Sequence, residues 1–119
     1  MKSWPARFER ARERLAPVLE AGGFRLVSLE RDENASDSAF AEYFRRALRL
    51  RLVWEGRERV LWVEAARQEG AQVVSRWHDV EWALAGERLP VNRDTSDARI
   101  DALVEAVRRF LAAPPTPSP

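Results

Sequence analysis

An imidazole stands beside a carboxylate at only one place in the sequence, His78-Asp79. A histidine works as a general base when a neighbouring group orients it and a pocket holds the substrate against it. Adjacent residues of a strand point to opposite faces, so adjacency in the sequence does not supply that orientation. His78 is therefore the single catalytic candidate. The competing interpretation is a surface histidine next to the N-cap of a helix.

The residue types in the sequence do not favour a metal or cofactor site. The chain has one histidine and no cysteine, so a zinc site would need to be built from carboxylates, and these are scattered without ligand spacing. The glycine pair Gly22-Gly23 fits a helix end better than a phosphate-binding loop. We therefore expect no metal and no cofactor, and we favour a non-enzymatic protein.

Arginine and tryptophan are the residue types that point to a binding surface. Five tryptophans are many for 119 residues, and aromatic residues and arginine are enriched at the centres of protein interfaces. The predicted binding residues are Arg45, Arg49, Arg51, Trp62, Glu64 and Trp77.

Two kinds of partner suit such a surface. Single-stranded nucleic acid stacks its bases on aromatic rings set among arginines. The net charge of +1, from 20 basic and 19 acidic residues, gives no general attraction to polyanions or acidic membranes. A protein partner, or self-association as a homodimer through a sheet face or an edge strand, is the favoured interpretation, and nucleic acid is the alternative.

The N-terminal sequence lacks the apolar segment of a signal peptide, and no run approaches the ~20 apolar residues of a membrane span. We therefore predict a cytoplasmic protein that does not engage a membrane.

A hairpin over 44–67 is predicted to position the binding residues. Leucine and arginine alternate along its first strand, which is typical of a strand buried on one face. One face carries Leu48, Leu50, Leu52 and Trp54, and the other carries Arg45, Ala47, Arg49, Arg51 and Val53.

The turn at Gly56 sets the expected register. A two-residue loop of Gly56-Arg57 is predicted, whereas a loop of Glu55-Gly56 would shift every partner by two and keep the faces. The first loop pairs Leu52 with Leu61, Leu50 with Val63, Leu48 with Ala65, Arg51 with Trp62 and Arg49 with Glu64.

Helices are expected near both ends of the chain. Apolar residues recur at helical spacing from Trp4 to Leu19, ahead of Gly22-Gly23. A second apolar stripe runs from Ile100 to Leu111, with Thr95 or Ser96 as its N-cap.

Between these helices, strands are predicted over Phe24–Glu30 and Gln72–Trp77. Phe40–Tyr43 fits either the start of the long strand or a helical turn. We favour Asp79 as the N-cap of a short helix, Val80–Ala85, ended by Gly86. The alternative continues the strand through Trp82.

The elements together predict an α+β fold. We expect a two-layer sandwich in which an antiparallel meander of about four strands carries the N- and C-terminal helices on one face. Residues 1–113 would form one domain, and 114–119 a disordered proline-rich tail. By analogy of architecture alone, the domain resembles bacterial adaptors, secretion chaperones and immunity proteins. No motif identifies a family.

Overall fold

The computed structural model describes residues 4–32 and 37–112, so the predicted tail over 114–119 lies outside the described residues. The fold is α+β, with an antiparallel sheet and helices near both ends of the chain. Its elements are α1 (Ala6–Ala21), β1 (Arg25–Asp32), β2 (Ser38–Arg45), β3 (Leu48–Glu55), β4 (Val60–Glu69), β5 (Gln72–Val73), β6 (His78–Asp79), α2 (Val80–Ala85) and α3 (Asp97–Ala112).

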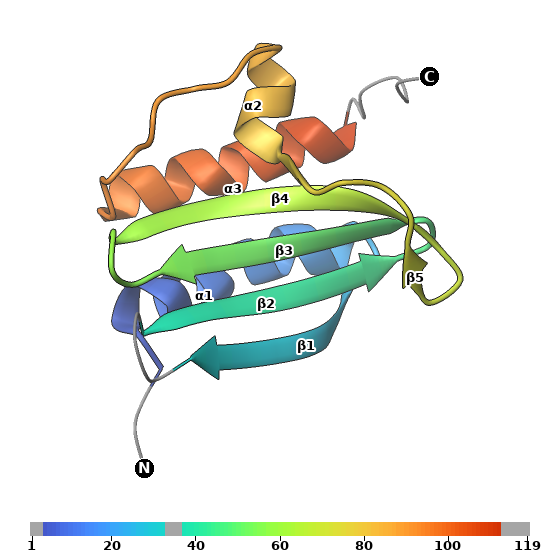
Figure 1. Cartoon of the computed structure of the whole chain (residues 1–119), viewed down its shortest axis with the longest axis horizontal. Coiled ribbons are helices and arrows are strands. Elements are labelled where there is room, and N and C mark those ends of the chain that lie inside the picture. Colours follow the sequence, from blue (N-terminus) through green and yellow to red (C-terminus); the bar gives the residue numbers. More distant parts are fainter. Residues whose placement is uncertain (1–3, 33–36, 113–119) are drawn as a thin grey trace.

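The strands follow one another across the sheet in the order β1-β2-β3-β4-β5, and β6 also pairs with β4. Figure 1 shows α1 behind the strands, α3 running alongside β4 at that edge of the sheet, and the short α2 against α3. None of the described helices is long and apolar enough to cross a membrane. The side of the sheet turned away from α1 and α3 is called the outer face below.

The predicted long strand beginning at Phe44 is wrong, because the chain reverses at Arg46-Ala47. Residues 38–45 form a separate strand, β2, which pairs with both β1 and β3. Ala47 adopts a left-handed conformation with φ of 68°. Such a conformation is uncommon for a residue with a side chain, so the sequence carries no turn signal here.

The predicted register of the β3–β4 hairpin is also wrong, by two residues. The loop has four residues, Gly56 to Arg59. The carboxylate of Glu55 accepts hydrogen bonds from the backbone N–H groups of Arg57 and Glu58, at 3.3 and 2.6 Å, and so stabilises the wider loop. The faces predicted from alternation are unchanged, because a shift of two returns each side chain to the same side. The observed pairs are Leu52 with Val63, Leu50 with Ala65, Leu48 with Arg67, Arg51 with Glu64, Arg49 with Ala66 and Val53 with Trp62.

The core lies between the sheet and the two long helices. The predicted apolar stripes supply it, since Phe8, Leu15 and Leu19 of α1 are buried together with Ile100 and Val107 of α3. From the sheet come Ala39, Ala41, Tyr43, Leu50, Leu52, Trp54, Leu61, Val63 and Ala65.

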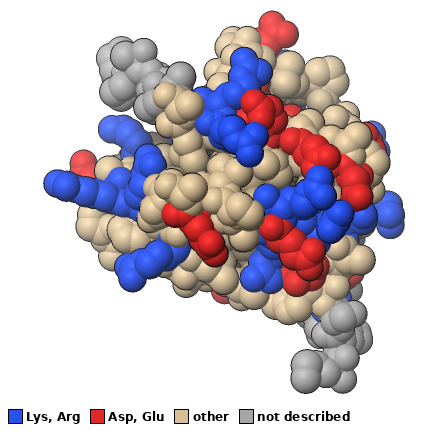
Figure 2. Space-filling model, turned by 180° about the vertical axis from the view of Figure 1, so that it is seen from behind, with Lys and Arg blue, Asp and Glu red and all other residues tan. Residues whose placement is uncertain are grey.

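On the helical side, basic and acidic side chains lie interleaved (Figure 2). Ion pairs join α1 to α3 there, between Arg7 and Asp97 and between Arg14 and Asp101.

The short helix predicted after Asp79 is confirmed as α2, and the alternative of a continued strand is wrong. Asp79 Oδ1 accepts from the N–H groups of Glu81 and Trp82, at 2.8 and 3.1 Å, and Gly86 ends the helix with φ of 75°. The strand predicted before it is too long, because only Gln72–Val73 pairs with β4. Ser75 lies beyond the paired residues of β5, and its side-chain hydroxyl accepts a hydrogen bond from the backbone N–H of Arg67.

Candidate functional site

A groove of about 790 Å³ lies along β4, and it brings together three of the predicted binding residues. Trp62 and Glu64 enter it from β4, and Trp77 from the segment before β6. Trp82 of α2 and Val91 of the α2–α3 loop line it too. Neither was among the binding residues predicted from the sequence. We call this feature the tryptophan groove.

Each tryptophan reaches the groove for a local reason. Trp62 lies on the outer face because its neighbours Leu61 and Val63 point into the core. Trp77 is held by Arg51, whose guanidinium carbon lies 4.0 Å from the centre of its ring. Trp82 belongs to the first turn of α2, which the Asp79 cap positions.

Arg49 and Arg51 lie on the outer face as predicted, but carboxylates neutralise both. Arg51 pairs with Glu64 at 2.8 Å and with Glu42 at 3.7 Å, while Arg49 lies 3.6 Å from Glu42. Arg49 Nε also donates to Gln68 at 2.8 Å. The exposed fractions of the Arg49 and Arg51 side chains are 19% and 25%. These arginines support the sheet face and Trp77, and they present little unpaired charge.

Arg45 lies apart from this group. It belongs to β2 and lies opposite Leu48, which puts it on the leucine side of the sheet, away from Arg49 and Arg51. Its guanidinium carbon lies 4.7 Å from the centre of the Phe24 ring, and its Nη1 donates to the Gly22 carbonyl at 3.1 Å. Arg45 therefore supports the connection between α1 and β1.

His78 is exposed and pairs with Ala65 in the short β6 ladder. It does not line the tryptophan groove, whereas its neighbour Asp79 does. Within residues 4–32 and 37–112, no cluster of three or more histidine, aspartate or glutamate side chains could hold a metal ion.

The groove lining is acidic. It contains Glu55, Glu58, Glu64, Asp79 and Glu81 against two arginines, Arg93 and Arg99.

Three of these acids have arginine partners. Glu81 pairs with Arg99 at 2.6 Å, Glu58 with Arg93 at 2.8 Å, and Glu64 with Arg51 at 2.8 Å. Glu55 and Asp79 pair with no arginine within the described ranges. The groove therefore keeps negative charge beside its aromatic rings.

Arg99 is the buried member of the site, with a side chain that is 6% exposed. Besides Glu81, it binds the carbonyl of Leu61 through Nη2 at 3.0 Å. It thereby joins α3 to α2 and to the outer edge of β4. No sequence signal identified Arg99, because it lies next to the apolar stripe of α3 and resembles any helix-surface arginine.

Burial raises the pKa of the Asp79 carboxyl, and the hydrogen bonds from α2 offset this only in part. Its folded-state pKa thus exceeds the ordinary value of 3.8. Ionised Asp79 is less stable in the folded protein than in the unfolded chain. The contribution of Asp79 to stability is consequently highest below its unfolded-state pKa and falls as pH rises through its folded-state pKa.

Asp79→Asn tests this sign. Asparagine can still cap α2 but does not titrate, so the wild type should lose stability relative to the variant as pH rises from about 3 to about 6. Urea unfolding of both proteins over that range measures the difference. Asp97, whose pKa Arg7 lowers, has the opposite dependence but cancels because both proteins contain it. A difference in stability that stays constant with pH would contradict the prediction.

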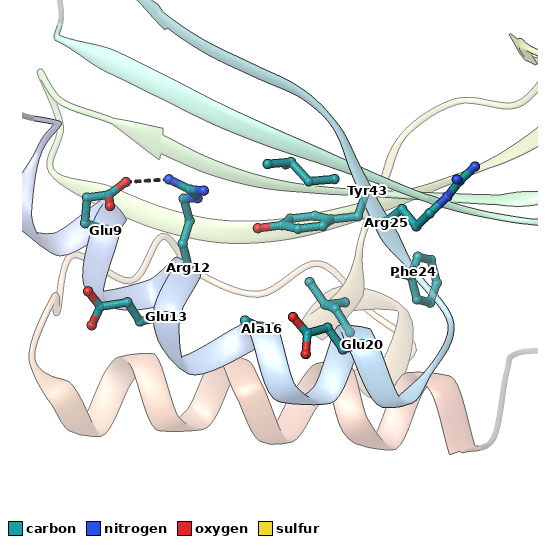
Figure 3. Close-up of a pocket in the computed structure, with 10 residues that line it drawn as sticks. Glu9, Arg12, Glu13, Ala16, Glu20, Phe24, Arg25 and Tyr43 are labelled. Carbon is teal, nitrogen blue, oxygen red and sulfur yellow. Dashed lines mark hydrogen bonds and ion pairs between the residues drawn. The ribbon is translucent and has the colours of Figure 1, made fainter.

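A second hollow, of about 540 Å³, opens between α1 and the start of β1 (Figure 3). Tyr43 and Arg12 point into the space between helix and sheet, and Arg12 binds Glu9 at 2.6 Å. Burial raises the pKa of the Tyr43 hydroxyl, which is therefore neutral at pH 7. Leu26 lines the hollow and is 44% exposed. In the sequence, apolar residues fall on both sides of this strand, with Leu26 on one side and Val27 and Leu29 on the other.

The comparisons with protein families, with curated proteins and with solved structures find no match.

Proposed function

We propose that this protein is a non-enzymatic interaction domain, an adaptor or chaperone-like module that binds an extended segment of a partner protein in the tryptophan groove. One observation carries the proposal, the gathering of three tryptophans in a single groove with Leu89, Pro90 and Val91. Val91 is 62% exposed, so the groove has an apolar wall open to a partner. Partly exposed aromatic residues in a concave site are the usual anchors of protein recognition.

The dimensions suit a short peptide. The groove follows β4 from Val60 to Glu64, which is about 13 Å at the rise of an extended strand. About four residues of an extended segment span that length. With both long helices on the other side of the sheet, as in a two-layer sandwich, this face remains available for a partner.

We expect recognition through side chains rather than addition of a strand to β4. Glu64 and Ala65 already pair with β6, and Arg99 donates a hydrogen bond to the Leu61 carbonyl. The outer edge of β4 is therefore largely closed along the groove.

Self-association is a second candidate, and the opposite edge of the sheet favours it. There, Leu26 and Val27 of β1 are 44% and 46% exposed. A second copy pairing along β1 would cover both side chains. The nucleic-acid alternative gains no support, because five carboxylates line the groove and Arg49 and Arg51 are ion-paired.

Trp62→Ala tests the proposal. Peptides selected from a displayed library of random sequences on the wild-type protein should bind the variant at least about tenfold more weakly, because a central aromatic anchor is lost. The fold should persist, since Trp62 lies outside the core cluster. Trp4→Ala is the control, as Trp4 stacks on Phe8 away from the groove. No enriched peptide, or equal binding to Trp62→Ala, would refute the proposal.

A further inference from the structure

We infer that the tryptophan groove recognises a basic side chain, the guanidinium of arginine or the ammonium of lysine, held over the ring of Trp62 beside the carboxylate of Glu55. This inference rests on the proposed function and specifies the chemistry of the bound segment.

The groove already holds cations of its own chain on two of its three tryptophans. The Arg51 guanidinium carbon lies 4.0 Å from the centre of the Trp77 ring, and that of Arg88 lies 5.3 Å from the centre of the Trp82 ring. No arginine of the described ranges lies over the Trp62 ring. Trp62 is partly exposed in the groove, and the face of an indole ring attracts a cation electrostatically.

Glu55 is the carboxylate that register places near Trp62. On the outer face, Val53 lies opposite Trp62 and Glu55 lies opposite Val60. Glu55 and Trp62 are thus diagonal neighbours, and residues in that relation lie about 7–8 Å apart, a span that long side chains bridge. A guanidinium stacked on Trp62 can therefore reach the Glu55 carboxylate.

The charge of Glu55 is not neutralised within the described ranges. Its carboxylate accepts hydrogen bonds from the Ser38 hydroxyl at 3.2 Å and from the N–H groups of Arg57 and Glu58. These donors orient the carboxylate but carry no positive charge. The same bonds hold it in place before a ligand arrives, which reduces the ordering that binding requires.

The apolar walls of the groove strengthen the attraction. Leu89, Pro90 and Val91 line the groove with Trp62 and displace water from around the ring when a segment binds. A cation on an aromatic face is bound more tightly once it is desolvated. An apolar residue on either side of the basic one would complete the match to these walls.

Two synthetic libraries of capped tetrapeptides test the inference. Their third residue is fixed as arginine in one and as citrulline, its uncharged isostere, in the other, and the remaining positions are leucine, valine, phenylalanine or proline. Binding to the immobilised full chain is measured peptide by peptide. We expect each citrulline peptide to bind about five- to 30-fold more weakly than its arginine partner.

Two variants locate the preference. Glu55→Gln removes the negative charge but keeps a side-chain oxygen that can accept the hydrogen bonds of the turn. Trp62→Leu removes the aromatic ring but keeps an apolar side chain. Each should reduce the preference for arginine, whereas Glu105→Gln, on α3 and outside the groove, should leave it intact. An unchanged preference in both groove variants would overturn the assignment.

The two proposals fail differently. Equal binding of both libraries would overturn the basic-residue inference and leave peptide binding standing. Absence of binding by either library, together with failure of the random-library selection, would refute both.

Discussion

Replacing Arg99 with methionine should lower the free energy of unfolding by about 3 kcal/mol, a large effect for one residue beside the groove. The Arg99 side chain is 6% exposed and pairs with Glu81 at 2.6 Å. Its loss leaves the Glu81 carboxylate, 22% exposed, without a cation, and leaves the Leu61 carbonyl without its donor. Urea unfolding followed by circular dichroism measures the change.

Two further variants separate the buried pair from surface charge. Adding Glu81→Gln to Arg99→Met should recover part of the stability, because residue 81 then no longer carries a charge that has lost its partner. Arg93→Met should cost at most about 1 kcal/mol, because its pair with Glu58 is 64% and 53% exposed. Equal losses from Arg93→Met and Arg99→Met would show that burial does not set the strength of these pairs.

Leu61→Ala should destabilise the fold by about 2–5 kcal/mol. Leu61 is 0% exposed and lies in the core cluster, so its removal opens a cavity between sheet and helices. Thermal and urea unfolding measure the loss. Val91→Ala, at a residue that is 62% exposed, should change stability by no more than about 0.5 kcal/mol.

Leu61 and Trp62 then form an informative pair. They are adjacent on β4 and point to opposite faces of the sheet, so Leu61→Ala should reduce stability and Trp62→Ala should reduce peptide binding. A loss below about 1 kcal/mol for Leu61→Ala would place the core elsewhere.

Arg99 connects stability to the proposed function. It joins α3, α2 and the β4 edge, and α2 carries Trp82 into the groove. A binding site works best when the elements that carry it are held rigidly. Arg99→Met should therefore weaken peptide binding as well as lower stability.

Periodicity alone was enough to predict the buried faces of β3, β4, α1 and α3. The leucines of β3 and the stripes of α1 and α3 lie inside as expected, because the side-chain repeat of a strand or helix follows from local backbone geometry. The Asp79 cap and the Gly86 end of α2 are also local, since each involves residues within one turn.

The pairing of strands could not be read in the same way. The chain turns at Ala47 without a glycine or asparagine, so the sequence pattern predicted one continuous strand where the structure has β2 and β3. Arg45 was therefore predicted on the wrong side of the sheet. The loop after Glu55 widened because that carboxylate binds two backbone N–H groups, which a two-residue turn rule does not include.

The tryptophan groove depends on contacts between residues that are far apart in the chain. Trp62, Trp77 and Trp82 meet because β6 pairs with β4 at Glu64 and Ala65, and because Arg99 ties α3 to Glu81. Alternation shows which side of an element is buried, but long-range pairing determines which elements become neighbours. Residue types and spacing therefore predicted that a tryptophan–arginine surface exists, and the three-dimensional packing determined its members, its acidic character and its shape.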